Sequence, residues 1–84
     1  MNTEDIQKFI SSHKMGAENY LKITFKKRDA VYGIIVNSTD SADLHPKNFW
    51  RIVSFANMKE WNDSKNLNFS RIFNGQEFSK LAVV

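Results

Sequence analysis

The stretch that decides the fold runs from residue 21 to residue 36 and reads LKITFKKRDAVYGIIV. In residues 21–25 apolar and polar side chains alternate strictly. Successive side chains leave opposite faces of a strand, so this period of two predicts a strand with one buried face. A polar break at residues 27–30 is typical of a hairpin loop. The chain returns through residues 31–36, which are apolar on both faces, so we expect this second strand to lie between two covers.

The residues ahead of this hairpin predict a helix of about residues 2–15. Asn2 or Thr3 can cap its first turn by accepting a hydrogen bond from a free backbone N–H, and Gly16 suits the stop beyond its last turn. Three apolar residues at helical spacing form one stripe: Ile6, Phe9 and Ile10. A helix this short needs a surface to lie on, so we expect the stripe to pack against the sheet.

A long polar segment, residues 37–48, follows the hairpin. A loop of this length is at the upper end for a compact domain, so it is either functional or mobile. Residues 49–55 predict a third strand by their aromatic and β-branched content. Residues 57–61 either continue this strand after a bend or form a fourth one.

The last part of the chain predicts one more hairpin. Residues 67–73 form its first strand, and Asn74 and Gly75 both tolerate the positive φ angles that a tight turn needs. Residues 76–84 are ambiguous between helix and strand, and their apolar end favours a closing strand.

One helix and about five short strands together predict a mainly β fold. We expect a small five-stranded barrel of about residues 20–84, with the N-terminal helix packed on it, in a single domain of residues 1–84. Closure into a barrel removes the exposed edges that an open sheet would have to protect.

The order of these elements resembles that of the Sm-like barrel and of SH3-like small barrels. In the second Sm-like motif a short apolar strand ends in a cation followed by Gly, and residues 72–75, IFNG, stand in the corresponding place here. The line from Pro46 through residues 49–53 to residues 69–72 also resembles the small WYL-type barrel of bacterial regulators. The likeness is one of pattern and covers most of residues 3–84, and it implies a barrel of this kind.

The Sm-like resemblance carries no RNA site over to this chain. Sm-like proteins hold RNA through an Asp-and-Asn motif after the second strand and through the cation ahead of the Gly in the second motif. This chain has NSTD at residues 37–40, and Asn74 precedes Gly75. Both places depart from the family pattern, so neither contact is expected.

Composition excludes several classes of function. The chain has no cysteine, which excludes disulfides, thiol catalysis and zinc ribbons and fits a reducing compartment. No apolar run reaches the roughly 20 residues needed to cross a bilayer, and the acidic first residues lack the pattern of a signal peptide. We therefore expect a soluble cytoplasmic protein without a membrane partner. The net charge of +3 permits an anionic partner without requiring one.

No group of residues points to catalysis, to a cofactor or to a metal. The two histidines, His13 and His45, have no nucleophile motif around them, and three glycines are too few for a phosphate-cradling loop. Asp40 and Asp43 lie close to His45 in sequence, but any solvated turn contains such residues. We expect neither catalytic residues nor a bound metal or cofactor.

The candidate nucleic-acid site is the basic face of the first hairpin: Lys22, Lys26, Lys27 and Arg28. Clustered cations neutralise phosphates, and exposed aromatic side chains stack on bases. These lysines have a second interpretation, because cations on an outward strand face keep the strand soluble and block edge pairing. We favour the second interpretation, since the net charge is small and Asn74 stands where the family has its cation.

Two tryptophans remain to be placed. Trp50 lies in an apolar run and is predicted to belong to the core, whereas Trp61 lies among polar residues and is the candidate for an exposed protein contact. The sequence predicts a non-catalytic binding or assembly module, whose ligand is an unknown protein partner or a second copy of the chain. An RNA- or DNA-binding domain is the alternative, and a small enzyme or enzyme accessory protein comes third.

Overall fold

The computed structural model describes residues 1–13 and 20–84. Its elements follow in the order α1 (Thr3–Ser12), β1 (Leu21–Phe25), β2 (Val31–Ile35), α2 (Ser41–Leu44), η1 (His45–Lys47), β3 (Phe49–Ser54), η2 (Phe55–Asn57), α3 (Met58–Ser64), η3 (Leu67–Phe69), β4 (Arg71–Asn74), η4 (Gly75–Glu77) and β5 (Phe78–Val83). With the short 3-10 turns (η) counted, about 42% of the described chain is helical and 33% is strand. The expectation of a mainly β fold with one helix is therefore wrong, because three α-helices lie in the described part.

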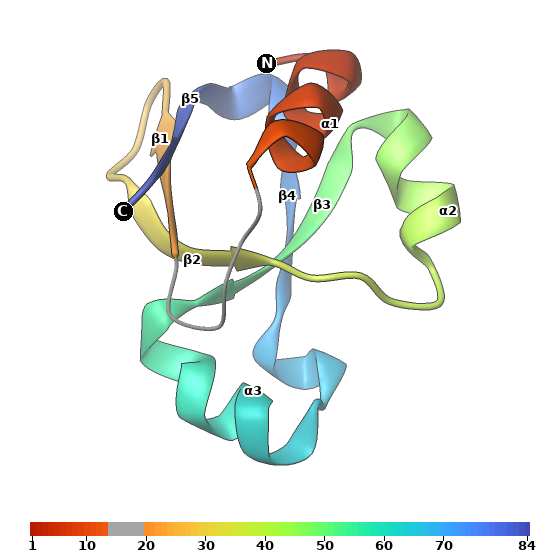
Figure 1. Ribbon diagram of the computed structural model, residues 1–84, viewed down its shortest axis with the longest axis vertical. Helices are drawn as coiled ribbons and strands as arrows, with labels where there is room; N and C mark the ends of the chain where they lie inside the picture. The colour runs from red at the N-terminus through yellow and green to blue at the C-terminus, as the bar shows by residue number, and fades with distance from the viewer. Residues whose placement is uncertain (14–19) are drawn as a thin grey trace.

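The five strands form one antiparallel sheet in the order β4-β3-β2-β1-β5 (Figure 1). The expectation of five short antiparallel strands is confirmed. The two edge strands, β4 and β5, do not pair with each other, so the prediction of a closed barrel is wrong.

Asn74 and Gly75 do not form the predicted hairpin turn. The φ angle of Asn74 is −83°, and its side chain accepts a hydrogen bond from the backbone N–H of Gln76 at 2.9 Å. Asn74 therefore caps η4. Asn residues serve both in tight turns and as caps whose side chain binds a backbone N–H two residues on, and here the second role applies. The chain crosses to the opposite edge of the sheet, where β5 pairs with β1 and the N–H of Lys26 donates to the carbonyl of Glu77 at 2.9 Å.

The N-terminal helix begins as its sequence predicts. The side chain of Asn2 accepts a hydrogen bond from the N–H of Asp5 at 2.8 Å, which caps α1. Ile6 is wholly buried, and Phe9 and Ile10 pack partly buried against the same core. The predicted last residues of the helix and its Gly stop lie outside the described residues.

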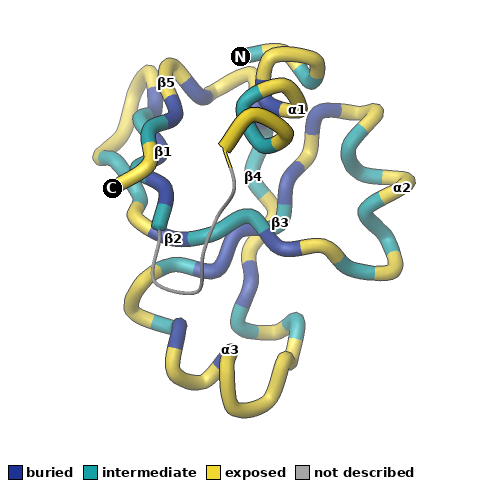
Figure 2. The backbone as a smooth tube through the Cα atoms, in the orientation of Figure 1, coloured by how far each residue is buried: buried dark blue, intermediate teal, exposed yellow. Residues whose placement is uncertain are grey.

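The face of the sheet beneath α1 carries the larger core, which we call the inner cluster. Its buried members are Ile6, Leu21, Ile23, Phe25, Trp50, Ile52, Phe78 and Leu81. Figure 2 shows this burial concentrated in β1, β3 and β5. The alternation in β1 is confirmed, since every second residue of that strand is buried. Ile34 and Ile35, which we expected to be buried, are only partly so.

The opposite face carries a smaller core, the outer cluster, beneath α3. Its buried members are Val36, Val53, Met58 and Trp61. The prediction of a strand over residues 57–61 is wrong. Met58 and Trp61 are three residues apart, so a helix brings both onto the sheet, whereas a strand would send them to opposite faces. Side chains of β2 contact both clusters, but only Gly33 of this strand is buried, so the expectation that β2 lies between two covers is confirmed only in part.

Residues 37–48, which we expected to be one loop, contain α2 and η1 and return the chain to β3. Asn48 ends this segment in the left-handed conformation, with φ at 64°, and is buried. Its side chain accepts a hydrogen bond from Trp50 Nε1 at 2.8 Å and donates to the carbonyl of Met1 at 2.9 Å. Its own carbonyl accepts from the N–H of Gly75 at 2.8 Å. Asn48 thus joins three segments that are distant in sequence.

Candidate binding surfaces

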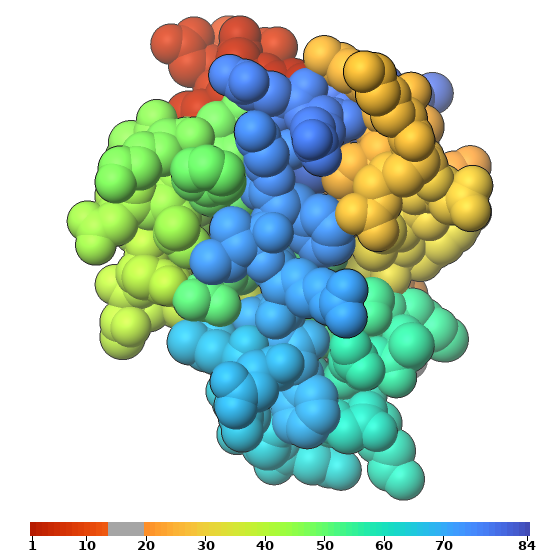
Figure 3. All heavy atoms as spheres, turned by 180° about the vertical axis from the view of Figure 1, so that it is seen from behind, coloured from red at the N-terminus to blue at the C-terminus, as the bar shows by residue number. Residues whose placement is uncertain are grey.

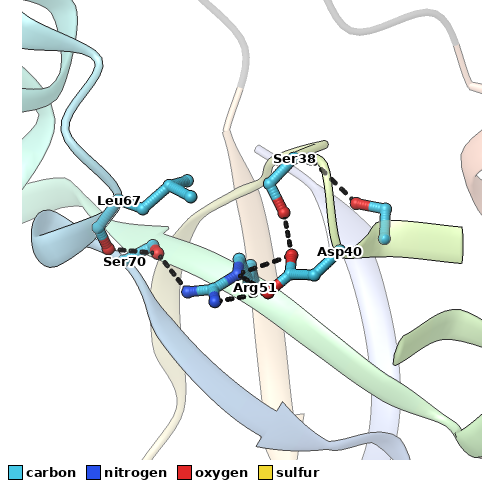
Figure 4. A network of polar contacts seen from close by, with 6 residues as sticks. Ser38, Asp40, Arg51, Leu67 and Ser70 are labelled. Carbon is cyan, nitrogen blue, oxygen red and sulfur yellow. Dashed lines mark hydrogen bonds and ion pairs between the residues drawn. The ribbon is translucent and has the colours of Figure 1, made fainter. Parts of the chain in front are cut away.

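A network of polar contacts ties the outer side of β3 to the segment after β2 (Figure 4). Arg51 donates from Nε and Nη2 to the Asp40 carboxylate, with a shortest N–O distance of 2.6 Å, and from Nη1 to Ser70 Oγ at 3.3 Å. The hydroxyl of Ser38 also donates to Asp40, and that of Ser70 donates to the carbonyl of Leu67 at 2.7 Å. Among the described residues, Arg51 and Asp40 form the one ion pair.

The contacts of this pair determine its charge state. The hydrogen bonds from Arg51 and Ser38 hold the pKa of the Asp40 carboxyl well below its ordinary value of 3.8. The hydrogen bond to Asp40 raises the pKa of the Arg51 guanidinium. Both groups stay charged at neutral pH, and the Asp40 carboxylate neutralises the charge of the Arg51 guanidinium and accepts its hydrogen bonds. Arg51 therefore holds residues 37–40 on the sheet and is not free to bind another anion.

Both histidines are stacked on aromatic rings. The rings of His13 and Phe9 have centroids 4.1 Å apart, and those of His45 and Trp50 are 4.2 Å apart. Burial lowers the pKa of His45, whose Nε2 is buried without a hydrogen-bond partner among the described residues. Within residues 1–13 and 20–84, no three His, Asp or Glu side chains lie close enough together to hold a metal ion. The expectation that catalytic residues, metal and cofactor are all absent stays a prediction.

The structure brings three of the four candidate nucleic-acid residues around one pocket, in the loop between β1 and β2. This loop pocket measures about 270 Å³ and is lined by Phe25, Lys26, Lys27, Arg28, Gln76 and Glu77. The carboxylate of Glu77 offsets part of the positive charge there. Lys22 does not line this pocket: its Nζ lies 5.9 Å from the centroid of the Tyr32 ring, a cation–π contact.

A second pocket, which we call the two-arginine pocket, brings Arg28 together with Arg71 of β4. It measures about 300 Å³ and is lined by Arg28, Val31, Ile52, Ser54, Asn57, Phe69, Arg71 and Phe73. Its lining contains no carboxylate. In Figure 3 the three contributing segments meet on one face: the orange β1–β2 loop, the teal segment after β3 and the blue β4. The pocket joins two cations that are far apart in sequence.

The third surface is the apolar groove, which lies beside the end of β3. It measures about 640 Å³ and is lined by Tyr20, Val31, Tyr32, Ser54, Phe55, Ala56 and Val84. The side chain of Phe55 is 61% exposed and that of Tyr32 is 46% exposed. The Phe55 ring stands edge-on to Tyr20, with centroids 5.1 Å apart. No side chain of the lining is charged at neutral pH.

The prediction that Trp61 is an exposed contact is wrong. Trp61 is only 8% exposed and packs in the outer cluster, with Lys65 Nζ 5.4 Å from its ring centroid. The polar neighbours of Trp61 line the other faces of α3, so the sequence around it gives no sign of the buried face. The prediction that Trp50 belongs to the core is confirmed, since it has no exposed surface.

Most residues of the apolar groove and of the two-arginine pocket carried no sequence signal of their own. Arg71 lies in the predicted strand of residues 67–73, but nothing local indicated that it lines one pocket with Arg28. Phe55 directly follows β3, but Ile52 and Val53 are both buried, so the pattern of the strand does not mark Phe55 as exposed. Ser54 and Asn57 are ordinary polar residues in sequence, and only the fold places them in the two-arginine pocket.

None of the helices in the described part of the chain has the length and hydropathy that crossing a lipid bilayer requires. Comparison of the chain with protein-family models, with curated proteins and with solved structures gives no match.

Proposed function

We propose that this chain is a non-catalytic assembly module whose apolar groove packs against a second copy of the chain. The exposure of Phe55 carries this proposal. Its ring is more than half exposed although it directly follows a buried strand, and Tyr32 and Val84 beside it are also exposed. Adjacent exposed apolar side chains mark surfaces that bury themselves against a partner, because removing them from water is favourable.

A second copy suits the groove for an electrostatic reason. The chain has a net charge of +3, yet the side chains that line the groove carry no charge, so two copies meeting there bring no like-charged side chains into contact. Interface cores are enriched in aromatic residues and depleted of charged ones, which matches this lining. A two-fold arrangement would use the same groove on both copies.

The open sheet supports the same proposal. The edge strands β4 and β5 leave backbone donors and acceptors that a neighbouring copy can pair with. We also propose that the sheet is an open form of the Sm-like or SH3-like small barrel, which the order of the elements resembles.

Sedimentation velocity from micromolar to millimolar concentration tests the proposal. We expect the wild type to shift from monomer to dimer and Phe55→Ser to remain monomeric. The matched control is Phe49→Ser, since Phe49 is also an exposed aromatic residue but does not line the groove. A wild type that is monomeric throughout, or a control that weakens association as much as Phe55→Ser, contradicts the proposal.

A second candidate function is nucleic-acid binding, favoured by the gathering of Lys26, Lys27 and Arg28 around the loop pocket. Removing one cation that touches a phosphate should lower the slope of log affinity against log salt by about one, whatever the base sequence. We expect replacement of all three residues by Ser to leave binding of the second copy unchanged and to reduce solubility. Salt-sensitive binding of single-stranded RNA by the wild type, abolished in the triple variant, would establish this second function instead.

A further inference from the structure

We propose that the two-arginine pocket binds a phosphate monoester. This inference goes beyond the assembly function, because it concerns a different ligand and rests on different side chains. The pocket lies beside the apolar groove and shares only Val31 and Ser54 with it. Its residues come from the β1–β2 loop and the start of β2, from β3 with η2, and from η3 with β4.

The charge of the pocket is the first reason. Arg28 and Arg71 line one space of about 300 Å³ without a carboxylate in the lining. The ion pair of the described residues uses Arg51 and Asp40, so neither of these two arginines has an acidic partner there. Two guanidinium groups facing one pocket repel each other, and an anion between them turns that repulsion into attraction.

The position of Arg28 is the second reason. Its guanidinium carbon lies 5.1 Å from the ring centroid of Phe25 and 5.4 Å from that of Phe73. The two rings attract the cation and restrict its side chain, although the residue as a whole is exposed. A restricted cation loses less conformational entropy when it binds a ligand, which favours a site over a mobile surface charge.

The neutral polar groups are the third reason. Ser54 and Asn57 add a hydroxyl and an amide to the lining, and Asn57 Nδ2 lies 3.4 Å from Ser54 Oγ. These groups can donate hydrogen bonds to oxygens that the two guanidinium groups leave free. The rings of Phe69 and Phe73 give the organic part of a ligand an apolar wall.

The match of charge selects the ligand class. A phosphate monoester carries a charge of about −1.5 to −2 near neutral pH, which two guanidinium groups balance. A carboxylate or a phosphodiester brings only one negative charge. Each guanidinium can also form two parallel hydrogen bonds to phosphate oxygens. The monoester is therefore favoured, whether it belongs to a small molecule or to the phosphorylated end of a nucleic acid.

Calorimetry with four probes tests the proposal on the full chain. The probes are adenosine monophosphate, adenosine, and one short single-stranded oligonucleotide with either a 5′-phosphate or a 5′-hydroxyl. We expect adenosine monophosphate to bind and adenosine not to bind. Tighter binding of the 5′-phosphate oligonucleotide than of the monophosphate assigns the site to nucleic-acid ends, and equal or weaker binding assigns it to small phosphate esters.

Substitutions locate the binding. Arg71→Gln should weaken monophosphate binding at least about tenfold, because a hydrogen-bonded charge pair is removed, and Arg71→Lys should weaken it less. The charge-matched control is Lys59→Gln, an exposed cation on α3 outside the pocket, which should bind as the wild type does. Backbone amide NMR shifts during the titration should change and saturate at Ser54 and Asn57.

Three results would overturn the proposal. One is no binding of any phosphate probe, and another is an equal loss of affinity in the Arg71→Gln and Lys59→Gln variants. The third is equal binding of the two oligonucleotides with none of the monophosphate, which would indicate general attraction to the backbone. Dimerisation is measured separately with the Phe55→Ser variant, so failure here and failure of the assembly proposal are distinguishable.

Discussion

The two faces of the sheet differ in how completely they are used for stability. The inner cluster contains residues without any exposed surface, such as Trp50 and Phe78, and α1 covers it. The outer cluster is half as large, and α3 covers only part of that face. Beside α3 the chain leaves Tyr32 and Phe55 exposed. The difference indicates that the inner cluster supplies most of the stability of the fold, while the outer face keeps exposed apolar side chains that a partner can cover.

The largest expected effect is at the centre of the inner cluster. Trp50→Ala removes a fully buried ring and leaves the side chain of Asn48 without the hydrogen bond from Trp50 Nε1. We expect the free energy of unfolding to fall by about 3–5 kcal/mol, as for other large-to-small changes in a core. Chemical denaturation measures this decrease. A smaller decrease than that of Trp61→Ala would show that the outer cluster, and not the inner one, contributes more to the free energy of unfolding.

Trp61→Ala should lower the free energy of unfolding less than Trp50→Ala does, near the lower end of the same range of about 3–5 kcal/mol, although it removes the same side chain. Trp61 lies at the rim of the smaller cluster and keeps 8% of its surface exposed, so α3 can partly collapse onto the space. The same denaturation experiment compares the two variants directly. A complete loss of folding in Trp61→Ala would show that the outer cluster is as essential as the inner one.

The polar network on the outer side predicts a pH dependence. The pKa of Asp40 in the folded chain lies well below its ordinary value of 3.8. The ionised Asp40 carboxylate therefore contributes its full share to the stability of the fold above about pH 4, and this contribution is lost as the pH falls further. Asp40→Asn should therefore lower stability at neutral pH, and its difference from the wild type should shrink in acid. Urea denaturation at neutral pH and at about pH 3 measures both differences. A difference that does not change with pH would exclude the ion pair as its cause.

The smallest expected effect on stability is at the exposed groove. Phe55→Ser should change the free energy of unfolding by less than about 0.5 kcal/mol, since its ring is mostly exposed. The measurement belongs at a concentration low enough to keep the chain monomeric, so that loss of association does not contribute. A decrease comparable to that of Trp61→Ala would assign Phe55 to the core and remove it as a contact residue.

Part of the candidate site was visible in the sequence. The basic loop could be named in advance because Lys26, Lys27 and Arg28 are neighbours in the chain. The partner of Arg28 could not, since Arg71 reaches it only through the position of β4 beside β3. Local pattern likewise misplaced Trp61, because its burial depends on the face that α3 presents to the sheet.

The sequence by itself determined the features that depend on near neighbours. These are the cap at Asn2, the alternation of residues 21–25, the β1–β2 hairpin and the strand that begins at Phe49. Only the tertiary structure decided that β5 pairs with β1 rather than with β4, so that the sheet stays open. The reason is that hydrophobic periodicity specifies which face of a strand is buried, but not which edge it joins. The edge that a strand joins depends on contacts between segments far apart in sequence. The apolar groove and the two-arginine pocket depend on such contacts as well.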